Sequence, residues 1–193
     1  MHNIGIIIFD GVEELDAIGP WEVFQVAKQL GAKVQTQLIS LTGEEIKAHK
    51  GLTIGQHTSF ANSQLLDTIV MPGGAGTRLL LNNSEFHQAV TTLAKQCTWL
   101  TSVCSGSLVL AAMGCLVNKK ATSHHTCYQD LAQLNPTGTV ITYQRYVIDG
   151  NIITAAGISA GIDMALWLVG QLSSPQLAKK VQAYMEYQPA PPY

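Results

Sequence analysis

The amino-acid sequence predicts an α/β fold, a three-layer sandwich in which helices cover both faces of a mainly parallel central sheet. Short and nearly continuous apolar runs occur at residues 3–9, 69–71 and 99–103, as expected for strands buried on both faces. Segments with helical periodicity separate these runs along the chain. This alternation of strands and helices is typical of a parallel sheet with helical crossover connections.

Composition predicts one domain over residues 1–193. The chain has 193 residues, of which 47% are hydrophobic and 12% charged, enough to bury one sizeable core. A formal net charge of −2 without basic runs disfavours nucleic acid or a membrane surface as partner. We therefore expect a small, neutral or weakly polar molecule as substrate.

The sequence also predicts a cytoplasmic location. The first residues, MHNIGIIIFDG, have no positive lead and are interpreted as a strand rather than a signal peptide. No apolar run approaches the ~20 residues that span a bilayer. The four cysteines lack zinc-type or disulfide-framework spacing, which indicates a reducing compartment.

The amino-terminal third predicts a strand, a helix and a second strand. The strand at 3–9 ends in the turn Asp10-Gly11, and a helix is expected over 14–30, with Gly31 as its cap. Alternating residues at 34–41 predict a strand nearer the sheet edge. Residues 42–58 are polar and glycine-punctuated, which favours a hairpin with little chemistry.

A glycine-rich loop, Pro-Gly-Gly-Ala-Gly at residues 72–76, follows the strand at 69–71. Such a loop can aim backbone N–H groups, here those of Gly73 and Gly74, into a cleft as an anion or oxyanion site. It lacks the lysine and hydroxyl residue of a phosphate-binding loop, and a plain tight turn is the alternative. Arg78 is expected to form a cap or salt bridge and is given no catalytic role.

Cys104 stands where a strand at 99–103 runs directly into an apolar helix that ends at Gly114. Small residues frame it in Ser102-Val103-Cys104-Ser105-Gly106, the pattern of a nucleophile elbow. The helix end should favour thiolate and lower the pKa from ~8.5 to roughly 3.5–7.5. The alternative is a buried structural cysteine, which is our interpretation of the other three, Cys97, Cys115 and Cys127.

The remaining elements complete the alternation. A helix over 84–97, with Ser84 as candidate cap, precedes the cysteine strand, and another runs to about Leu134 after His124 and His125. Strands are expected at 140–143, 146–148 and 152–156, with a hairpin turn at 149–151. A helix opens within 157–161, where Asp163 would face the helix dipole, and Pro175 begins the last helix. An extended tail, residues 188–193, closes the chain.

Three carboxylates follow the first strand: Glu13, Glu14 and Asp16. Because clefts in such folds lie beyond the carboxyl ends of the strands, any of them could reach the thiol of Cys104. Spacing does not choose among them, and all three could instead decorate a helix start. A carboxyl buried against a thiolate would have a raised pKa and could donate a proton.

Four segments together resemble the ThiJ/PfpI superfamily, whose fold is flavodoxin-like and of the class I glutamine amidotransferase type. They are GVEELD at 11–16, MPGG at 71–74, SVCSG at 102–106 and ATSH at 121–124. LDAIGPWEVF, AAGISAGIDMAL and the closing PAPPY resemble the isonitrile hydratase branch and the amidotransferase-like domain of some AraC-type regulators. The absence of a DNA-binding domain from the sequence weakens the regulator interpretation.

The resemblance implies roles for individual residues. Cys104 would be the nucleophile, Asp16 its acid partner in place of the more usual glutamate, and Ser105 would stand beside them where hydratases commonly carry threonine. Gly74, with Gly73, would donate backbone N–H groups, and His124 would lie near the substrate. His125 replaces a common tryptophan, which leaves the pocket shape open.

The hydratase branch implies thiolate attack on an isonitrile, proton delivery by Asp16, and hydrolysis of a thioimidate to an N-substituted formamide. This reaction requires no metal and no organic cofactor. The resemblance to the superfamily also implies a homodimer. One alternative is a glyoxalase, amidase or peptidase that uses His124 as base. Another is a non-enzymatic redox or ligand sensor built on Cys104.

Overall fold

The computed structural model describes residues 1–189; the end of the expected tail, residues 190–193, lies outside the described part. Seven strands form one sheet in the order β10-β11-β7-β6-β1-β2-β5, parallel throughout except for β10, which is antiparallel to β11. Their bounds are β1 (His2–Ile7), β2 (Val34–Ser40), β5 (Thr58–Ser59), β6 (Thr68–Met71), β7 (Trp99–Val103), β10 (Tyr146–Asp149) and β11 (Ile152–Ala155).

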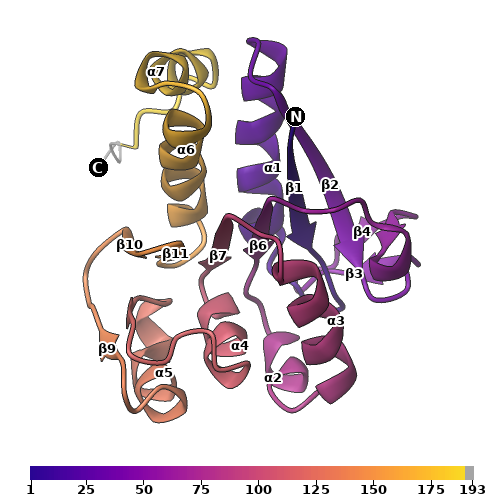
Figure 1. Cartoon of the computed structure of the whole chain (residues 1–193), viewed down its shortest axis with the longest axis vertical. Coiled ribbons are helices and arrows are strands. Elements are labelled where there is room, and N and C mark those ends of the chain that lie inside the picture. Colours follow the sequence, from indigo (N-terminus) through magenta and orange to yellow (C-terminus); the bar gives the residue numbers. More distant parts are fainter. Residues whose placement is uncertain (190–193) are drawn as a thin grey trace.

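Helices cover both faces of this sheet, which confirms the predicted three layers (Figure 1). One face carries α1 (Glu14–Gln29), α6 (Ala160–Leu172) and α7 (Pro175–Tyr184), which contact one another. The other carries α2 (Thr77–Leu80), α3 (Ser84–Ala94), α4 (Gly106–Ala112) and α5 (Tyr128–Leu134). Short 3-10 turns lie at Phe60–Asn62 and His125–Cys127.

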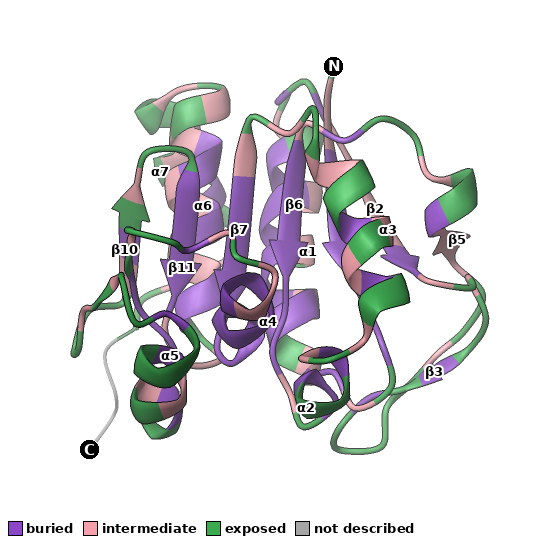
Figure 2. Ribbon diagram, turned by 60° about the horizontal axis from the view of Figure 1, so that its bottom comes forward, coloured by how far each residue is buried: buried purple, intermediate pink, exposed green. Residues whose placement is uncertain are grey.

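The central strands form the core because both of their faces are covered. Every residue of β6 and β11 is buried, as is the end of β7 that leads to Cys104 (Figure 2). The central order β2-β1-β6-β7-β11 is that of a flavodoxin-like sheet, and ligands in such sheets bind beyond the carboxyl ends of the strands. The fold therefore places the ends of β1, β6 and β7 together.

Several local predictions are confirmed. Residues 42–58 do form a hairpin, β3 (Ile46–Lys47) paired antiparallel with β4 (Thr53–Ile54). Gly31, at φ 102°, ends the first helix, and Gly150, at φ 64°, makes the turn between β10 and β11. Both glycines adopt the left-handed backbone that side chains disfavour.

Other local predictions are wrong. Asn83 caps α3 by accepting the N–H of Phe86 at 3.0 Å, and Ser84 is the first helical residue. The strand expected at 140–143 shrinks to β9 (Thr139–Val140), which pairs with β8 (Lys120–Ala121) outside the main sheet. Asp163 does lie in the first turn of its helix, as predicted, and it also forms an ion pair with Arg145 from the chain before β10, a long-range contact that helix-end statistics cannot foresee. The short helix α2 was not predicted.

Candidate active site

Cys104 occupies a tight turn between β7 and α4, as the nucleophile-elbow pattern predicts. Its φ of 56° lies in the left-handed region, which is rare for a residue with a side chain. Its N–H donates to the carbonyls of Ala155, at 3.1 Å, and Ala156, at 2.8 Å, at the end of β11. A Cβ on Gly106 would stand 2.1 Å from the carbonyl oxygen of Met71, so the turn requires glycine there. The strained turn is thus held by neighbours on both sides.

Asp16 is the carboxylate that reaches Cys104. The structure thereby distinguishes it from the other two candidates, Glu13 and Glu14. It lies on the first turn of α1, is 0% exposed, and its Oδ2 accepts the N–H of Gly73 at 2.8 Å. Its Oδ1 is buried and has no hydrogen-bond partner among residues 1–189. Glu13 instead binds Lys50, and Glu14 accepts the backbone N–H of Lys50.

Burial raises the pKa of Asp16 to about 7, and the nearby charge of Glu13 adds to this increase. The N–H of Gly73, which hydrogen-bonds the carboxylate, acts in the opposite direction, and so does the adjacent thiol of Cys104. Asp16 therefore exchanges a proton near neutral pH, which suits a group that must both accept and donate one.

The expected low pKa of Cys104 is wrong for the resting site. Burial, followed by the adjacent Asp16 carboxylate, raises the pKa of the thiol to about 12. The backbone N–H groups of Ser105 and Ile158 hydrogen-bond the sulfur and oppose this rise without overcoming it. The favourable effect of the N-terminus of the short helix α4 on the thiolate is outweighed, because Cys104 is buried and faces a carboxylate.

The two groups consequently behave as one titrating pair. When Asp16 is protonated, its repulsion of the thiolate disappears, so a single negative charge can lie on either the sulfur or the carboxylate. Moving the proton from sulfur to Asp16 creates the nucleophile and the acid in one step. That coupling can activate Cys104 without a freely ionised thiol.

The glycine loop supports the site more than it faces the cleft. The N–H of Gly73 is directed at Asp16, and that of Gly74 donates to the hydroxyl of Ser105 at 3.0 Å. Thr77 also donates to the Ser105 hydroxyl, at 3.2 Å. The expected donation to substrate is therefore not what Gly73 does here, and Gly74 would have to release Ser105 to do so. A Cβ on Gly73 would come within 2.9 Å of Asp16 Oδ2, so this loop must approach closely.

A cavity of about 410 Å³ opens above the sulfur. Its lining comes from the segments that follow β1, β6, β7 and β11, from the β3–β4 hairpin and from the chain after β8: Glu13, His49, Gly74, Ala75, Arg78, Cys104, Ser105, His124, Thr126, Cys127 and Ile158. Asp16 is not part of this lining and lies beneath it. A reactant in the cavity would thus meet Cys104 first, with Asp16 behind it.

Of the two adjacent histidines, His124 lines the cavity and His125 does not. The Nδ1 of His124 lies 2.8 Å from the hydroxyl of Thr126, which fixes the ring. Burial, together with the neighbouring His125, lowers the pKa of His124, so its ring is neutral at pH 7. Among residues 1–189, no group of three His, Cys, Asp or Glu side chains has the arrangement of a metal site.

Residues 2–171 match the DJ-1/PfpI family. The chain belongs to the DJ-1/PfpI family. It is 38% identical to isonitrile hydratase of Pseudomonas putida over 191 residues, 99% of this chain and 81% of that protein. It is 26% identical to a glutathione-independent glyoxalase DJ-1 of Schizosaccharomyces pombe over 184 residues, 90% of this chain and 93% of that protein. The superfamily resemblance and its flavodoxin-like fold are thereby confirmed.

Solved structures agree with this assignment. A ThiJ/PfpI family protein from Pseudomonas syringae superposes with a TM-score of 0.89 at 30% identity, covering 100% of this chain and 77% of that one. In the described part of this DJ-1/PfpI chain, no helix has the length and apolar character needed to cross a membrane.

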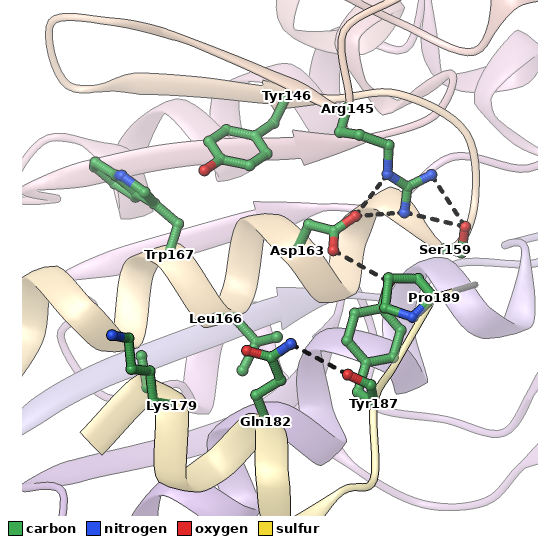
Figure 3. Close-up of a pocket in the computed structure, with 11 residues that line it drawn as sticks. Arg145, Tyr146, Ser159, Asp163, Leu166, Trp167, Lys179, Gln182, Tyr187 and Pro189 are labelled. Carbon is green, nitrogen blue, oxygen red and sulfur yellow. Dashed lines mark hydrogen bonds and ion pairs between the residues drawn. The ribbon is translucent and has the colours of Figure 1, made fainter. Parts of the chain in front are cut away.

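A second cavity in this DJ-1/PfpI protein, of about 730 Å³, lies between α6, α7 and β10 (Figure 3). Arg145 and Asp163 form an ion pair at one end, where Tyr187 also donates to Asp163 at 3.1 Å. Trp167 and Tyr146 form an aromatic wall, with ring centroids 6.5 Å apart. None of its lining residues is a cysteine, so Cys104 and this cavity are separate features.

Sequence reasoning missed several residues of the cysteine cavity, among them Thr126 and Cys127, the second of which was interpreted as a structural cysteine. His49 comes from the hairpin region that was expected to carry little chemistry, and its N–H donates to Val12 at 2.8 Å. Ile158 has φ 43°, an outlier for a β-branched residue, which no sequence pattern announces. Arg78 was treated only as a salt-bridge residue. Gly157, in the segment AAGIS, is a sequence feature that could have indicated this wall of the cavity. A Cβ at this position would stand 2.4 Å from the His124 ring, so the close approach requires glycine.

Proposed function

We propose that this protein is a cysteine-dependent isonitrile hydratase, which adds water to an isonitrile to give an N-substituted formamide. The observation that carries the proposal is the buried carboxyl of Asp16, with one unpartnered oxygen, set against Cys104 on the floor of a cavity. The identity of 38% to an isonitrile hydratase supports the same reaction.

In the first step the substrate's terminal carbon lies against Cys104. The thiol proton passes to Asp16, the sulfur attacks that carbon, and Asp16 returns the proton to it. One S–C bond and one C–H bond form while the S–H bond breaks, which gives a thioimidate, R–N=CH–S–Cys104. The N–H groups of Ser105 and Ile158, which hydrogen-bond the sulfur, stabilise the charge on it before the attack.

In the second step water adds to the thioimidate carbon. The C–S bond then breaks, the nitrogen keeps one proton of the water, and the sulfur regains the other through Asp16. The sum is R–NC plus H₂O giving R–NH–CHO, with the enzyme unchanged. A carboxyl whose pKa is about 7 can serve both proton transfers at neutral pH.

The test is to incubate the purified protein with cyclohexyl isonitrile and follow the formamide C–H signal by NMR. Catalytic turnover at many equivalents of product per protein, with a mass increase of one isonitrile on the peptide that contains Cys104 after acid quench, is the expected result. Formation of no formamide with this or smaller isonitriles would reject the hydratase proposal.

A second candidate is a glyoxalase or hydrolase in which His124 is the base. It is favoured by the position of the neutral His124 ring in the cavity and by the similarity to a glyoxalase. His124→Ala separates the two proposals, because a base-dependent reaction would lose most of its rate while isonitrile hydration would keep it. A redox or ligand sensor built on Cys104 is what remains if neither reaction occurs.

We also propose that the protein is a cytoplasmic homodimer. All four cysteines are free thiols, as suits a reducing compartment. Half-exposed or exposed apolar side chains lie on the helices of one layer, including Leu15 at 40% and Tyr184 at 55%, and a second copy would cover such surface. Light scattering after size exclusion should give twice the mass of 20.8 kDa, and a single-chain mass would contradict the dimer.

A further inference from the structure

Arg78 is the cation of the Cys104 cavity, and much of its hydrogen-bonding capacity is unused. It lies on α2, lines the cavity, and its side chain is 47% exposed. Its Nη2 donates to Asp130 Oδ2 at 2.9 Å and lies 3.7 Å from the sulfur of Cys127. Its Nε and Nη1 have no partner among residues 1–189. A guanidinium has five N–H donors in a planar fork, so it can hold Asp130 and still bind a second carboxylate.

The carboxylate that lines the cavity, Glu13, is already paired within the protein. Both carboxylate oxygens of Glu13 bind the ammonium of Lys50, at 2.5 and 2.7 Å. Lys50 does not line the cavity, and neither does Asp130. His124 is neutral at pH 7 for the reason given above. Arg78 is therefore the cationic donor that faces a bound molecule.

The cavity offers few large apolar side chains to a hydrocarbon substituent. Its lining contains no Phe, Tyr, Trp, Leu, Met or Val, and Ile158 is its single large aliphatic side chain. A cyclohexyl or aryl group would therefore have only Ile158 as a large apolar partner. Six of its lining residues have polar side chains: Glu13, His49, Arg78, Ser105, His124 and Thr126.

We infer that the cavity is built for small substrates that carry a carboxylate a few bonds from the reacting carbon, and that Arg78 is the specificity-determining residue that binds this carboxylate. The substrate class is then an isocyano-carboxylic acid, which rests on the proposed hydratase function. This differs from the neutral substrate that composition alone predicts, because the local charge of one cavity is not set by the net charge of the chain.

The first experiment compares two matched substrates, isocyanoacetate and its methyl ester, which differ in one negative charge. We expect kcat/KM for the anion to exceed that for the ester by about fivefold at low salt, as expected for a partly exposed ion pair, and the ratio to fall as salt is added. Arg78→Gln should remove this preference and leave the ester within about twofold. Arg78→Lys should restore part of it, because the charge returns without the fork.

Arg145→Gln is the matched control, because Arg145 is also ion-paired and half-exposed but lines only the second cavity. It should leave the ratio of the two substrates unchanged. A ratio near one in the wild type, or an equal loss for both substrates in Arg78→Gln, would overturn the inference.

A second readout does not depend on isonitrile chemistry. Iodoacetate and iodoacetamide both alkylate Cys104, forming an S–C bond with loss of iodide, and differ in the carboxylate. The measured quantity is the rate of Cys104 alkylation by iodoacetate divided by the rate with iodoacetamide. This ratio should be about fivefold higher in wild type than in Arg78→Gln. If this selectivity holds while no isonitrile is hydrated, the anion site stands and the hydratase proposal falls. If isonitriles are hydrated without the selectivity, the hydratase proposal stands and the anion site falls.

Discussion

Cys104→Ser is expected to reduce isonitrile turnover by at least about 10⁴-fold, to the level of the uncatalysed reaction. The hydroxyl has nearly the size of the thiol, so the buried turn between β7 and α4 can keep its backbone at φ 56°. Its proton, however, is held far more tightly than that of a thiol, and Asp16, with a pKa of about 7, is too weak a base to remove it. The change therefore removes the nucleophile with little change in structure.

Cys115→Ser is the matched control for this experiment. Burial raises the pKa of Cys115 as well, but this residue follows Gly114 and does not line the Cys104 cavity. Turnover in Cys115→Ser should stay within about twofold of wild type, since a conservative substitution at a partly buried position away from the site changes little. Both variants should melt cooperatively, followed by circular dichroism. Retained turnover in Cys104→Ser would mean that the proposed covalent step is wrong.

The elbow was predictable because its requirements are local. Small residues at 102–106 and the change from strand to helix pattern are visible in the sequence, and the structure has Cys104 in the expected left-handed turn. The parallel sheet follows in the same way from short apolar runs separated by helices. The end of a strand then locates the cleft, because parallel strands share one carboxyl edge.

The chemistry of the site was not predictable from the same signals. The pKa of Cys104 depends on how deeply the sulfur is buried and on Asp16, which is far away along the chain. His49 reaches the cavity through the pairing of β3 with β4, and spacing along the chain does not encode where a hairpin tip lies. The N–H of Gly73 is directed at a carboxylate because α1 begins beside the glycine loop. Each of these facts is a product of tertiary packing.

The shared proton of Asp16 and Cys104 is the feature of the fold on which the proposed function depends. A carboxyl placed on a helix start normally prefers to ionise, since the helix dipole favours the anion. Here burial reverses that preference, and one oxygen is left without a partner among residues 1–189. Such a group destabilises the protein whenever it is ionised, and retaining it is understandable only if the proton has a use.

Asp16→Asn is expected to lower kcat by roughly 10²- to 10⁴-fold, the range for removal of a general acid or base. The amide has the same shape and can still accept the N–H of Gly73, but it neither takes the thiol proton nor returns it to carbon. The remaining rate should no longer change near pH 7, where the wild-type profile reflects titration of the pair. A variant with wild-type kcat would remove Asp16 from the mechanism.

The same substitution should stabilise the protein at alkaline pH. The folded-state pKa of Asp16, about 7, is above the ordinary aspartate value of 3.8 that describes the unfolded chain. Protonated Asp16 therefore makes its full contribution to the free energy of unfolding below pH 3.8. This contribution is lost as the pH rises towards 7, by about 1.4 kcal/mol per pH unit at most. Between pH 5 and pH 8 wild type should lose up to roughly 3 kcal/mol of unfolding free energy that Asp16→Asn retains.

Urea titrations of both proteins at pH 5 and pH 8 measure this difference. Glu14→Gln on the same helix turn is a control of opposite sign. Although burial alone would raise its pKa, hydrogen bonds from the backbone N–H groups of Glu14, Lys50 and Leu52, with the charge of Lys50, lower the pKa of Glu14 overall. Its ionised form therefore stabilises the fold above its unfolded pKa, and its replacement should weaken the protein at pH 8. If Asp16→Asn were also less stable than wild type at pH 8, Asp16 would be ionised at no cost, and the shared proton would have to be abandoned as the basis of the mechanism.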